Sequence, residues 1–456
     1  MPYVRRSGRL ESARSIGHVP IVENELIKER LRSWRIHAAQ SDTQPHPALV
    51  VPADQLGTPG EPIRWVMSFD GSPQEVPVQE KYPSTRVGYV QIAAVLVNLR
   101  RMLGQETRPL VDPAVIRSAV HQSLSSMVLP CSNVCRPDLG TVKDSWRAEV
   151  FEIFRDYSVE DSGLLDVFML LVSHSDKRSA SGGVVLNRCS VSDACNARAI
   201  DVPRLGTTCP SCGGMLYPTD ALRIHEEVLE EHPNLTALGR LMTCLEHIVM
   251  MACLSFLYQR QPRVLGYVGF ILDGPLALFG PQAWLHTALL AYIHKVNGEL
   301  TRNNLRCPVL LGVEKTGQFA EHAADIADHI PPRSVMMLPD EYIYDHILTF
   351  RPPAGSRFGR DTYYGQKFFY QTAQGQLLTI TVPKIEEVVA DEHHPAHYPC
   401  LPNTLALLDR VGTNLYEDAL IPVALAHSFA SIPLRIGSKV LAVLSRELLG
   451  QAGSEQ

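Results

Sequence analysis

An apolar stretch that runs into an aspartate and a glycine occurs twice in this chain, and it constrains the fold more than any other feature. In the first copy, Ile63 to Phe69 are rich in β-branched and aromatic side chains and lead into Asp70 and Gly71. Such residues favour a strand with a buried face, and glycine permits a sharp turn after it. In the second copy, Val268 to Leu272 lead into Asp273 and another glycine. We therefore predict two core strands, each with a carboxylate at its C-terminal end.

Further elements are indicated between and after these two copies. Val87 to Val97 is typical of a long buried strand, and antiparallel pairing with the first strand is the simplest arrangement. Periodicity predicts helices at 219–258, 284–296, 318–330, 404–408 and 422–431, and strands at 265–272, 309–313, 367–371 and 377–382. Strands that alternate with helices in this way imply an α/β protein with a mixed sheet.

The chain length fits one large domain with insertions, or two domains. Its 456 residues, 45% of them hydrophobic and 20% charged, are enough to bury a sizeable core. We expect an N-terminal helix and a linker in residues 1–60, and a main domain in residues 61–456. Within that domain, the spacing of apolar residues predicts a helical insertion at 105–180, followed by a cysteine-rich insertion at 181–218.

Charge and hydropathy exclude few functions. The net charge of −6 argues against a uniformly basic nucleic-acid-binding surface, although it is compatible with a local basic groove. No apolar segment follows the basic start at Arg5 and Arg6, and the most continuous apolar run, Ile248 to Tyr258, is too short to cross a bilayer. We therefore expect a cytoplasmic protein that does not enter a membrane.

Four closely spaced cysteines predict a metal site. They are Cys189, Cys195, Cys209 and Cys212. The last two belong to a Cys-Pro-Ser-Cys-Gly-Gly run, a tight turn that can point two thiolates at one ion. Tetrahedral Zn²⁺ takes four such ligands, and a site with four cysteines has no open position, so a structural zinc is favoured over a catalytic one. The alternatives are reduced cysteines in a loop without metal, or a ligand pair supplied by Cys131 and Cys135.

Three carboxylates are placed so that they could share a divalent cation. Asp70 and Asp273 follow strands, and Glu246 lies in an apolar helical run before the second of them. Together they would hold one or two Mg²⁺ or Mn²⁺ ions, which prefer oxygen ligands. Two such ions, about 3.5–4 Å apart, are suited to phosphodiester hydrolysis. The alternative is an ordinary Asp-Gly turn for each aspartate and a partly exposed helix position for Glu246.

Basic residues downstream indicate a phosphate-binding surface. Lys315 follows a third strand, where it could bind the scissile phosphate or simply be a solvated turn residue. Arg357, Arg360 and Lys367 are interleaved with aromatic residues that include Tyr364. This combination suits a nucleic-acid groove, through phosphate charge and base stacking. Half of those aromatic residues are better explained as core residues, since a strand must bury one face.

His427 and a separate cluster of three histidines each have more than one interpretation. His427 lies on an apolar helix, where a lone histidine is usually a core residue and becomes a ligand or proton carrier only on independent grounds. His393, His394 and His397 have the composition of a metal site, but their polar, proline-flanked setting favours a loop.

Several motifs, taken in order, resemble the NurA nuclease family. They are Phe69 to Ser72, Arg86 to Val97, Ile271 to Leu276, Gly312 to Phe319, Tyr364 to Tyr370 and Pro422 to His427. The resemblance implies an RNase H-like mixed sheet flanked by helices and a manganese-dependent DNA nuclease that forms a homodimer. It also implies partnership with a HerA-type hexameric ATPase in DNA-end resection or phage defence.

The resemblance carries roles onto residues of this chain. It implies Asp70 and Asp273 as metal ligands, Glu246 as the helical acid, Lys315 as a phosphate contact and His427 as a late active-site histidine. The expected activity is that of a 5′ to 3′ exonuclease, a single-strand endonuclease or both. The helical and cysteine-rich insertions depart from the compact archaeal pattern. The alternatives are a non-catalytic DNA-binding or assembly subunit of an ATPase complex and an RNase H-like enzyme that acts on RNA.

Overall fold

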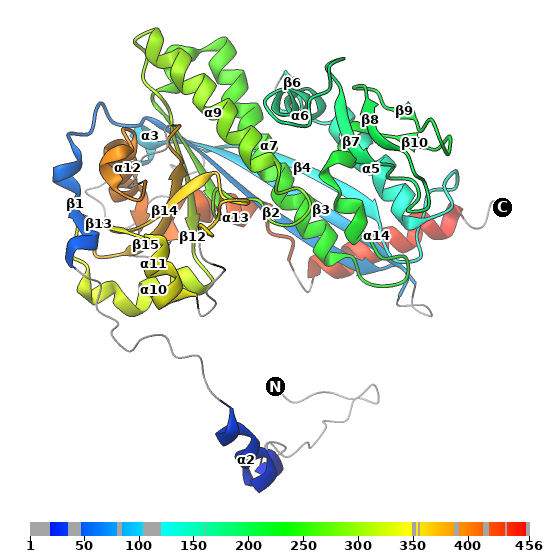
Figure 1. Ribbon diagram of the computed structural model, residues 1–456, viewed down its shortest axis with the longest axis horizontal. Coiled ribbons are helices and arrows are strands. Elements are labelled where there is room, and N and C mark those ends of the chain that lie inside the picture. The colour runs from blue at the N-terminus through cyan, green and yellow to red at the C-terminus, as the bar shows by residue number, and fades with distance from the viewer. Residues whose placement is uncertain are drawn as a thin grey trace.

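A nine-stranded mixed β-sheet forms the centre of the molecule (Figure 1). The computed structural model describes residues 19–34, 47–79, 84–103, 120–159, 161–348, 353, 356–386, 392–413, 419–433 and 436–452. Across the sheet the strands are β1 (Val50–Pro52), β13 (Ser334–Met337), β14 (Gly365–Gln371), β15 (Leu377–Pro383), β12 (Val309–Glu314), β11 (Val268–Asp273), β2 (Trp65–Pro77), β3 (Arg86–Asn98) and β4 (Val120–Pro130). The predicted α/β class with a mixed sheet is confirmed.

The sheet has a parallel centre between two antiparallel wings. Strands β2, β3 and β4 follow one another in the chain and pair antiparallel, as predicted for the first two of them. Strand β11 runs parallel to both β2 and β12. On the far side, β12, β15, β14, β13 and β1 pair antiparallel in that order. The two predicted Asp-ending strands are therefore direct neighbours.

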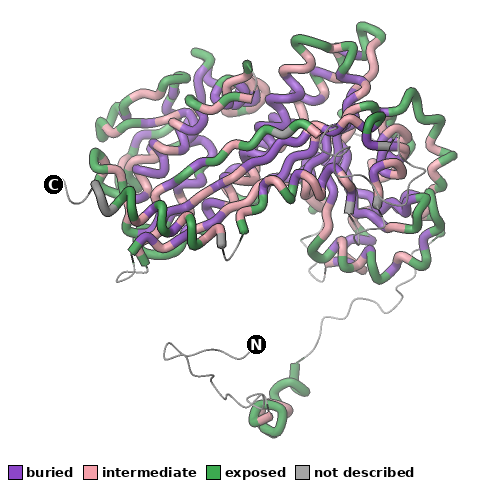
Figure 2. Tube along the Cα trace, turned by 180° about the vertical axis from the view of Figure 1, so that it is seen from behind, coloured by how far each residue is buried: buried purple, intermediate pink, exposed green. Residues whose placement is uncertain are grey.

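Side chains alternate between two cores on the two faces of the sheet. Phe69 of β2 and Phe270 of β11 belong to one core, where their rings stack with centroids 6.4 Å apart. Val66 and Ile271 of the same strands belong to the other core. Figure 2 shows the resulting continuous buried interior along the central strands. Because both faces are covered, these strands are almost entirely apolar.

Helices cover both faces (Figure 1). The first core includes α5 (Val142–Asp156), α6 (Leu164–Val172), α7 (Leu235–Arg260) and α9 (Leu285–Arg302). The second includes α12 (Leu401–Val411) and α13 (Ile421–Ala430). A third, smaller core is formed around α10 (Gln318–Ile326), and α14 (Ile436–Ala452) contacts β2. The sheet is thus enclosed between helices contributed by distant parts of the chain.

Several shorter elements complete the described chain. The short helices are α1 (Val19–Glu23), α2 (Glu25–Ser33), α3 (Leu99–Leu103), α8 (Pro262–Leu265) and α11 (Asp340–Tyr342), with single turns at Pro47–Leu49, Ala53–Leu56, Pro218–Leu222, Ile224–Glu227, Ala327–His329, Ile343–Ile347 and Pro395–His397. The short strands are β5 (Ser158–Val159), β6 (Ser162–Gly163), β7 (Val184–Arg188), β8 (Arg198–Val202), β9 (Thr207–Thr208), β10 (Met215–Leu216), β16 (Gly412–Thr413) and β17 (Ala419–Leu420).

Helix α7 begins later than the helix predicted over 219–258, because Pro218–Leu222 and Ile224–Glu227 form single turns, but it is longer than the apolar run Ile248 to Tyr258. Its 26 residues are long and apolar enough to cross a membrane by length and composition, and 72% of its most apolar stretch is buried inside the protein. Residues such as Leu241, Leu245 and Ile248 are fully enclosed in the first core. In this fold α7 is therefore the central core helix against β2 and β3.

The segment predicted as a helical insertion contains a strand. Val120–Pro130 forms β4 and pairs with β3, whereas α5 and α6 supply the helices expected later in the segment. In β4, Met127 and Leu129 are buried and Val128 between them is exposed, which is the period of a strand. The helical prediction is therefore wrong for these residues. Residues 104–119 of the segment lie outside the described part of the chain.

The N-terminal helix predicted within residues 1–60 corresponds to α1 and α2. Asn24 caps α2 by accepting hydrogen bonds from the N–H groups of Leu26 and Ile27. Neither helix has a buried residue, and Figure 1 shows α2 apart from the main domain. Apolar side chains such as Leu26 and Trp34 are exposed, so α2 contributes nothing to the described cores.

Candidate active site

Asp70 lies within β2 rather than at its end. The parallel pairing of β11 with β2 stops at Phe69, but β2 continues to Pro77 in register with β3. Gly71 is therefore part of an extended strand, and the predicted sharp turn at Gly71 is wrong. At the second copy the turn is real, because β11 ends at Asp273 and Gly274 has φ of 132°. Asp70 is thus the first residue of β2 beyond the pairing with β11, and it lies next to the C-terminal end of β11.

Gly71 is required by space. A Cβ atom at this position would lie 2.5 Å from Cγ of Met242 and 2.8 Å from Oε1 of Glu246, both on α7. Contacts this short do not occur with a real side chain, so the absence of a side chain allows α7 to approach the strand. The close approach brings the helical acid to the main chain beside Asp70.

Asp70, Asp273 and His427 form a compact group of metal-ligating side chains. One ligand atom from each lies within 4.8 Å of the other two. Nδ1 of His427 is 2.8 Å from Oδ2 of Asp70, and this ring nitrogen is the donor whenever Asp70 is ionised, because a carboxylate only accepts. Helix α13 packs through its apolar residues and leaves the His427 side chain 66% exposed, whereas Asp70 is enclosed. The group is therefore open to solvent on the histidine side.

Glu246 lies beside this group but is not one of its three members. It is buried in α7, and its pKa is well above the usual value, first because of burial and then because of the charges of Asp70 and Asp273. A hydrogen bond from the N–H of Gly71 acts in the opposite direction. The structure thus brings Glu246 close enough to interact with both aspartates electrostatically.

The site carries more negative than positive charge. Burial and the charge of Asp273 raise the pKa of Asp70, and its hydrogen bond with His427 lowers it. Lys315, which follows β12, supplies a compensating charge, with Nζ 2.9 Å from Oδ2 of Asp273. Clustered carboxylates that remain under-compensated favour a bound cation. The Asp70, Asp273 and His427 group could therefore hold a metal ion, with carboxylates of the kind that Mg²⁺ and Mn²⁺ prefer.

Two residues predicted to contact nucleic acid are buried. Lys367 lies in β14 and forms an ion pair with Glu314 at 2.6 Å, with its Nζ 3.5 Å from the ring centroid of Phe319. Tyr364 is completely buried and packs edge-on against His247. Neither side chain is accessible to a ligand from solvent in this structure.

The remaining predicted nucleic-acid contacts lie at the surface. Arg357 and Arg360 are exposed, and Arg357 pairs with Glu392 at 3.3 Å. A role in nucleic-acid binding stays a prediction for these two arginines.

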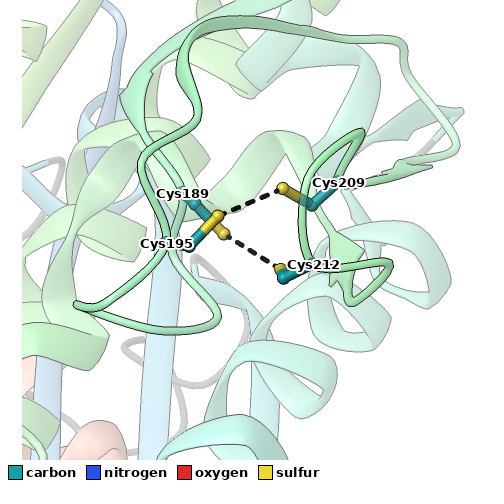
Figure 3. A group of neighbouring side chains, drawn as sticks. All are labelled: Cys189, Cys195, Cys209 and Cys212. Carbon is teal, nitrogen blue, oxygen red and sulfur yellow. Dashed lines mark hydrogen bonds between the residues drawn. The ribbon is translucent and has the colours of Figure 1, made fainter.

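The four predicted zinc ligands converge (Figure 3). Their sulfur atoms lie within 4.8 Å of one another, and the pairs Cys189 with Cys212 and Cys195 with Cys209 are each 3.7 Å apart. Four sulfurs at about 2.3 Å from a tetrahedral zinc would be separated by about 3.8 Å. The spacing therefore fits a tetrahedral ion, and the group could hold a metal.

Main-chain donors surround these sulfur atoms. The N–H of Val191 donates to Sγ of Cys189 at 3.4 Å. Hydrogen bonds from the N–H groups of Cys212 and Ser211 lower the pKa of Cys209 to about 6, which favours the thiolate that a metal needs. Among the described residues, Cys131 and Cys135 are not part of the group. The alternative ligand pair therefore has no support in the geometry.

The cysteine site is built into the protein rather than appended to it. Cys189 and Cys209 are buried in the first core together with apolar residues of β7 and β8. Asp220, downstream of the site, forms a buried ion pair with Arg147 of α5 at 2.7 Å. A metal bound here would therefore stabilise the packing of the surrounding helices as well as its own loops.

Sequence reasoning missed two features of the site. The first is the steric role of Gly71, which a glycine within a strand pattern could have signalled. The second is the pairing of Lys367 with Glu314, which joins β14 to the end of β12 although β15 lies between them in the sheet. No sequence signal indicates this pairing, because the two residues are far apart in the chain.

Comparisons with known proteins add little. No family model matches the chain, and no curated protein sequence matches it. Among solved structures, the NurA nuclease from Sulfolobus solfataricus is similar with a TM-score of 0.36 and 9% sequence identity, over 96% of each chain. The interpretation of the site therefore depends on its own geometry.

Proposed function

We propose that this protein is a divalent-metal-dependent DNA nuclease with its active site at Asp70, Asp273 and His427. The observation that carries the proposal is the convergence of these three ligand atoms within 4.8 Å, with Lys315 bound to Asp273 and Glu246 beside Asp70. These residues come from separate strands and helices of the fold. Several acids, a histidine and a lysine gathered in this way suit hydrolysis of a phosphate ester.

Each residue has a defined task in this proposal. Asp70 and Asp273 would hold Mn²⁺ or Mg²⁺, and a bound ion would favour the ionised form of Glu246 on the buried side. A bound ion would supply Lewis acidity toward a phosphoryl oxygen and toward water. Lys315 offsets the charge that develops on the phosphate, and the exposed His427 binds the ion or moves a proton at the solvent side.

The substrate and partners follow from the motif resemblance and stay proposals. We propose DNA as the substrate, a homodimer as the working form and a HerA-type hexameric ATPase as the partner, in DNA-end processing or phage defence. We also propose that β4, β3, β2, β11 and β12 correspond to an RNase H-like core. The antiparallel order of the first three strands and the parallel order of the last three support this assignment.

A cleavage assay tests the proposal. Purified protein is incubated with linear duplex DNA, single-stranded DNA, RNA and a DNA–RNA hybrid, with and without Mn²⁺ and the ATPase. We expect DNA cleavage that requires Mn²⁺, its loss in Asp70→Ala, and its retention in Asp161→Ala, a control at an exposed aspartate. Undiminished cleavage by Asp70→Ala would sink the assignment.

The same assay tests the alternative functions. DNA binding without cleavage by the wild-type protein, even with Mn²⁺ and the ATPase present, would identify a non-catalytic subunit. Preferential cleavage of RNA or of the hybrid would instead identify an RNA-directed enzyme.

A further inference from the structure

Two arginines lie side by side on a ribbon next to the four-cysteine site. Strands β7 and β8 pair antiparallel, and Arg188 is directly opposite Arg198. Both residues are exposed. Like charges in directly opposite positions destabilise a strand pair, so this pairing is unfavourable unless negative charge offsets it.

The protein offsets this charge only in part. Glu226 binds Arg188 at 3.0 Å and Arg223 at 2.7 Å. Although burial raises the pKa of Glu226, the hydrogen bonds from these two arginines lower it to about 2, so the carboxylate is ionised. Arg198 donates to the main-chain carbonyl groups of Cys195 and Ala197, which carry no net charge. The exposed Asp193 also lies near Arg188, at 3.9 Å, so two carboxylates face the three arginines Arg188, Arg198 and Arg223.

These groups line a cavity of about 360 Å³. Its charged lining residues are Lys177, Arg188, Arg198, Arg223, Asp220 and Glu226. Arg147 neutralises the charge of Asp220 in the protein interior, where its Nε and Nη2 atoms both donate to the carboxylate. The cavity therefore has a net positive lining, and Asn187 and Ser190 add polar groups to its wall.

We propose that this cavity binds backbone phosphates of the DNA substrate. Guanidinium groups bind phosphate with two parallel hydrogen bonds, and a phosphate at the ribbon would relieve the repulsion between Arg188 and Arg198. The ribbon is packed into the first core and ends at the cysteine site, so its arginines are held on a firm support. The identity of the ligand as DNA rests on the proposed function, whereas the affinity for phosphate rests on the cavity alone.

Binding of DNA without cleavage tests this inference. Full-length protein that carries Asp70→Ala and its zinc is titrated against fluorescently labelled duplex DNA, and anisotropy is followed over a series of salt concentrations. Arg188→Gln with Arg198→Gln is expected to weaken binding roughly tenfold and to reduce the slope of log affinity against log salt by about 2. The control is Arg155→Gln with Arg204→Gln, which removes the same charge from two exposed arginines outside the cavity.

Two further variants separate charge from folding. Arg188→Lys with Arg198→Lys keeps the charge but not the paired hydrogen bonds, so it should keep the salt slope and bind more tightly than the Arg188→Gln with Arg198→Gln variant. Lys177→Gln removes a cation that lies outside the ribbon and should reduce the salt slope by about 1. Zinc content and thermal melting confirm that each variant is folded. The inference would be overturned if Arg188→Gln with Arg198→Gln and Lys177→Gln both had the same affinity and salt slope as the control.

The result is independent of the nuclease assignment. If the wild-type protein binds DNA through these residues but cleaves nothing, the phosphate site stands and the proposed nuclease activity fails. If the wild-type protein cleaves DNA and the Gln variants bind it as the control does, the phosphate site fails and the nuclease stands.

Discussion

The carboxylate of Glu246 reaches the main chain of β2 at Gly71, where its Oε1 lies 2.8 Å from the place that a Cβ atom would occupy. The N–H of the same glycine donates to Oδ1 of Asp70 at 2.8 Å. One residue without a side chain thus allows an acid of the core helix to lie beside an acid of the core strand. The composition of the site depends on this close approach.

Replacing this glycine is expected to damage the site more than the fold. In Gly71→Ala, the new methyl group collides with the side chains of Met242 and Glu246, so these side chains, or α7 with them, must move away from Asp70. We expect a loss of Mn²⁺-dependent cleavage of about 100-fold and a loss of about 1–3 kcal/mol in the free energy of unfolding. Steady-state cleavage rates and urea unfolding measure the two effects.

The matched control for this change is Gly298→Ala in α9. No atom lies within 4 Å of its added Cβ, and alanine is favoured over glycine in a helix. This variant should keep full activity. Activity of Gly71→Ala equal to that of Gly298→Ala would show that the close approach of α7 is unimportant.

The raised pKa of Glu246 predicts how stability depends on pH. The folded state holds the proton of Glu246 more tightly than the unfolded state does, so stability falls as pH rises from about 4.5 through the raised pKa. Glu246→Gln removes this loss. Without added divalent metal, its melting temperature should exceed that of the wild-type protein at pH 8, by roughly 2 °C per kcal/mol recovered, and the difference should shrink toward pH 5.

Added Mn²⁺ should reverse this order. The ion stabilises the wild-type carboxylates by binding to the folded state, and Glu246→Gln should gain less from it. Scanning calorimetry at both pH values, with and without Mn²⁺, measures the effect. A variant that melts below the wild-type protein by the same amount at pH 5 and pH 8 would mean that Glu246 has only a packing role.

Lys315 is expected to affect the rate of cleavage rather than the affinity for metal. In the absence of metal, its ammonium group binds the Asp273 carboxylate at 2.9 Å and so competes with a metal ion. Lys315→Met should therefore bind Mn²⁺ at least as tightly as the wild-type protein. Its turnover number should fall by about 100-fold, because the charge on the phosphate is no longer offset. A matching loss of Mn²⁺ affinity would instead indicate that Lys315 only positions Asp273.

Metal analysis tests the cysteine site. Cys212→Ser should lose bound zinc, and its free energy of unfolding should fall by several kcal/mol, because the site is continuous with the first core. Cys135→Ser, at an exposed cysteine outside the group, should retain one zinc per chain. Zinc retained in Cys212→Ser and lost in Cys135→Ser would return the choice to the alternative ligand pair.

Much of the fold could be predicted from short-range pattern. Apolar runs bounded by polar residues indicated the core strands, and the antiparallel neighbours β2 and β3 followed from their adjacency in the chain. The prediction failed at Val120–Pro130, where a strand of period two was overlooked among helical segments. It failed again at Gly71, because a glycine needed for close approach and a glycine needed for a turn look alike in sequence.

The candidate site could be predicted only in part, because some of its contacts depend on long-range pairing between strands. Asp70 and Asp273 share the Asp-Gly pattern, and the structure places them together on neighbouring strands. By contrast, every residue of β14 is buried, and the ion pair of Lys367 with Glu314 depends on where the sheet places β14 relative to the end of β12. The opposition of Arg188 and Arg198 depends on the register of β7 with β8. Neither relationship has a local signal, since both are set by long-range pairing.

Titration of Mn²⁺ into the protein, with DNA cleavage followed on the same sample, tests the central claim most directly. The wild-type protein and the exposed-site control Asp161→Asn should bind Mn²⁺ and cleave DNA. Asp273→Asn should bind Mn²⁺ at least roughly tenfold more weakly and lose cleavage in proportion, because it lacks a ligand of the group. Equal Mn²⁺ affinity and equal cleavage in Asp273→Asn and Asp161→Asn would contradict the account.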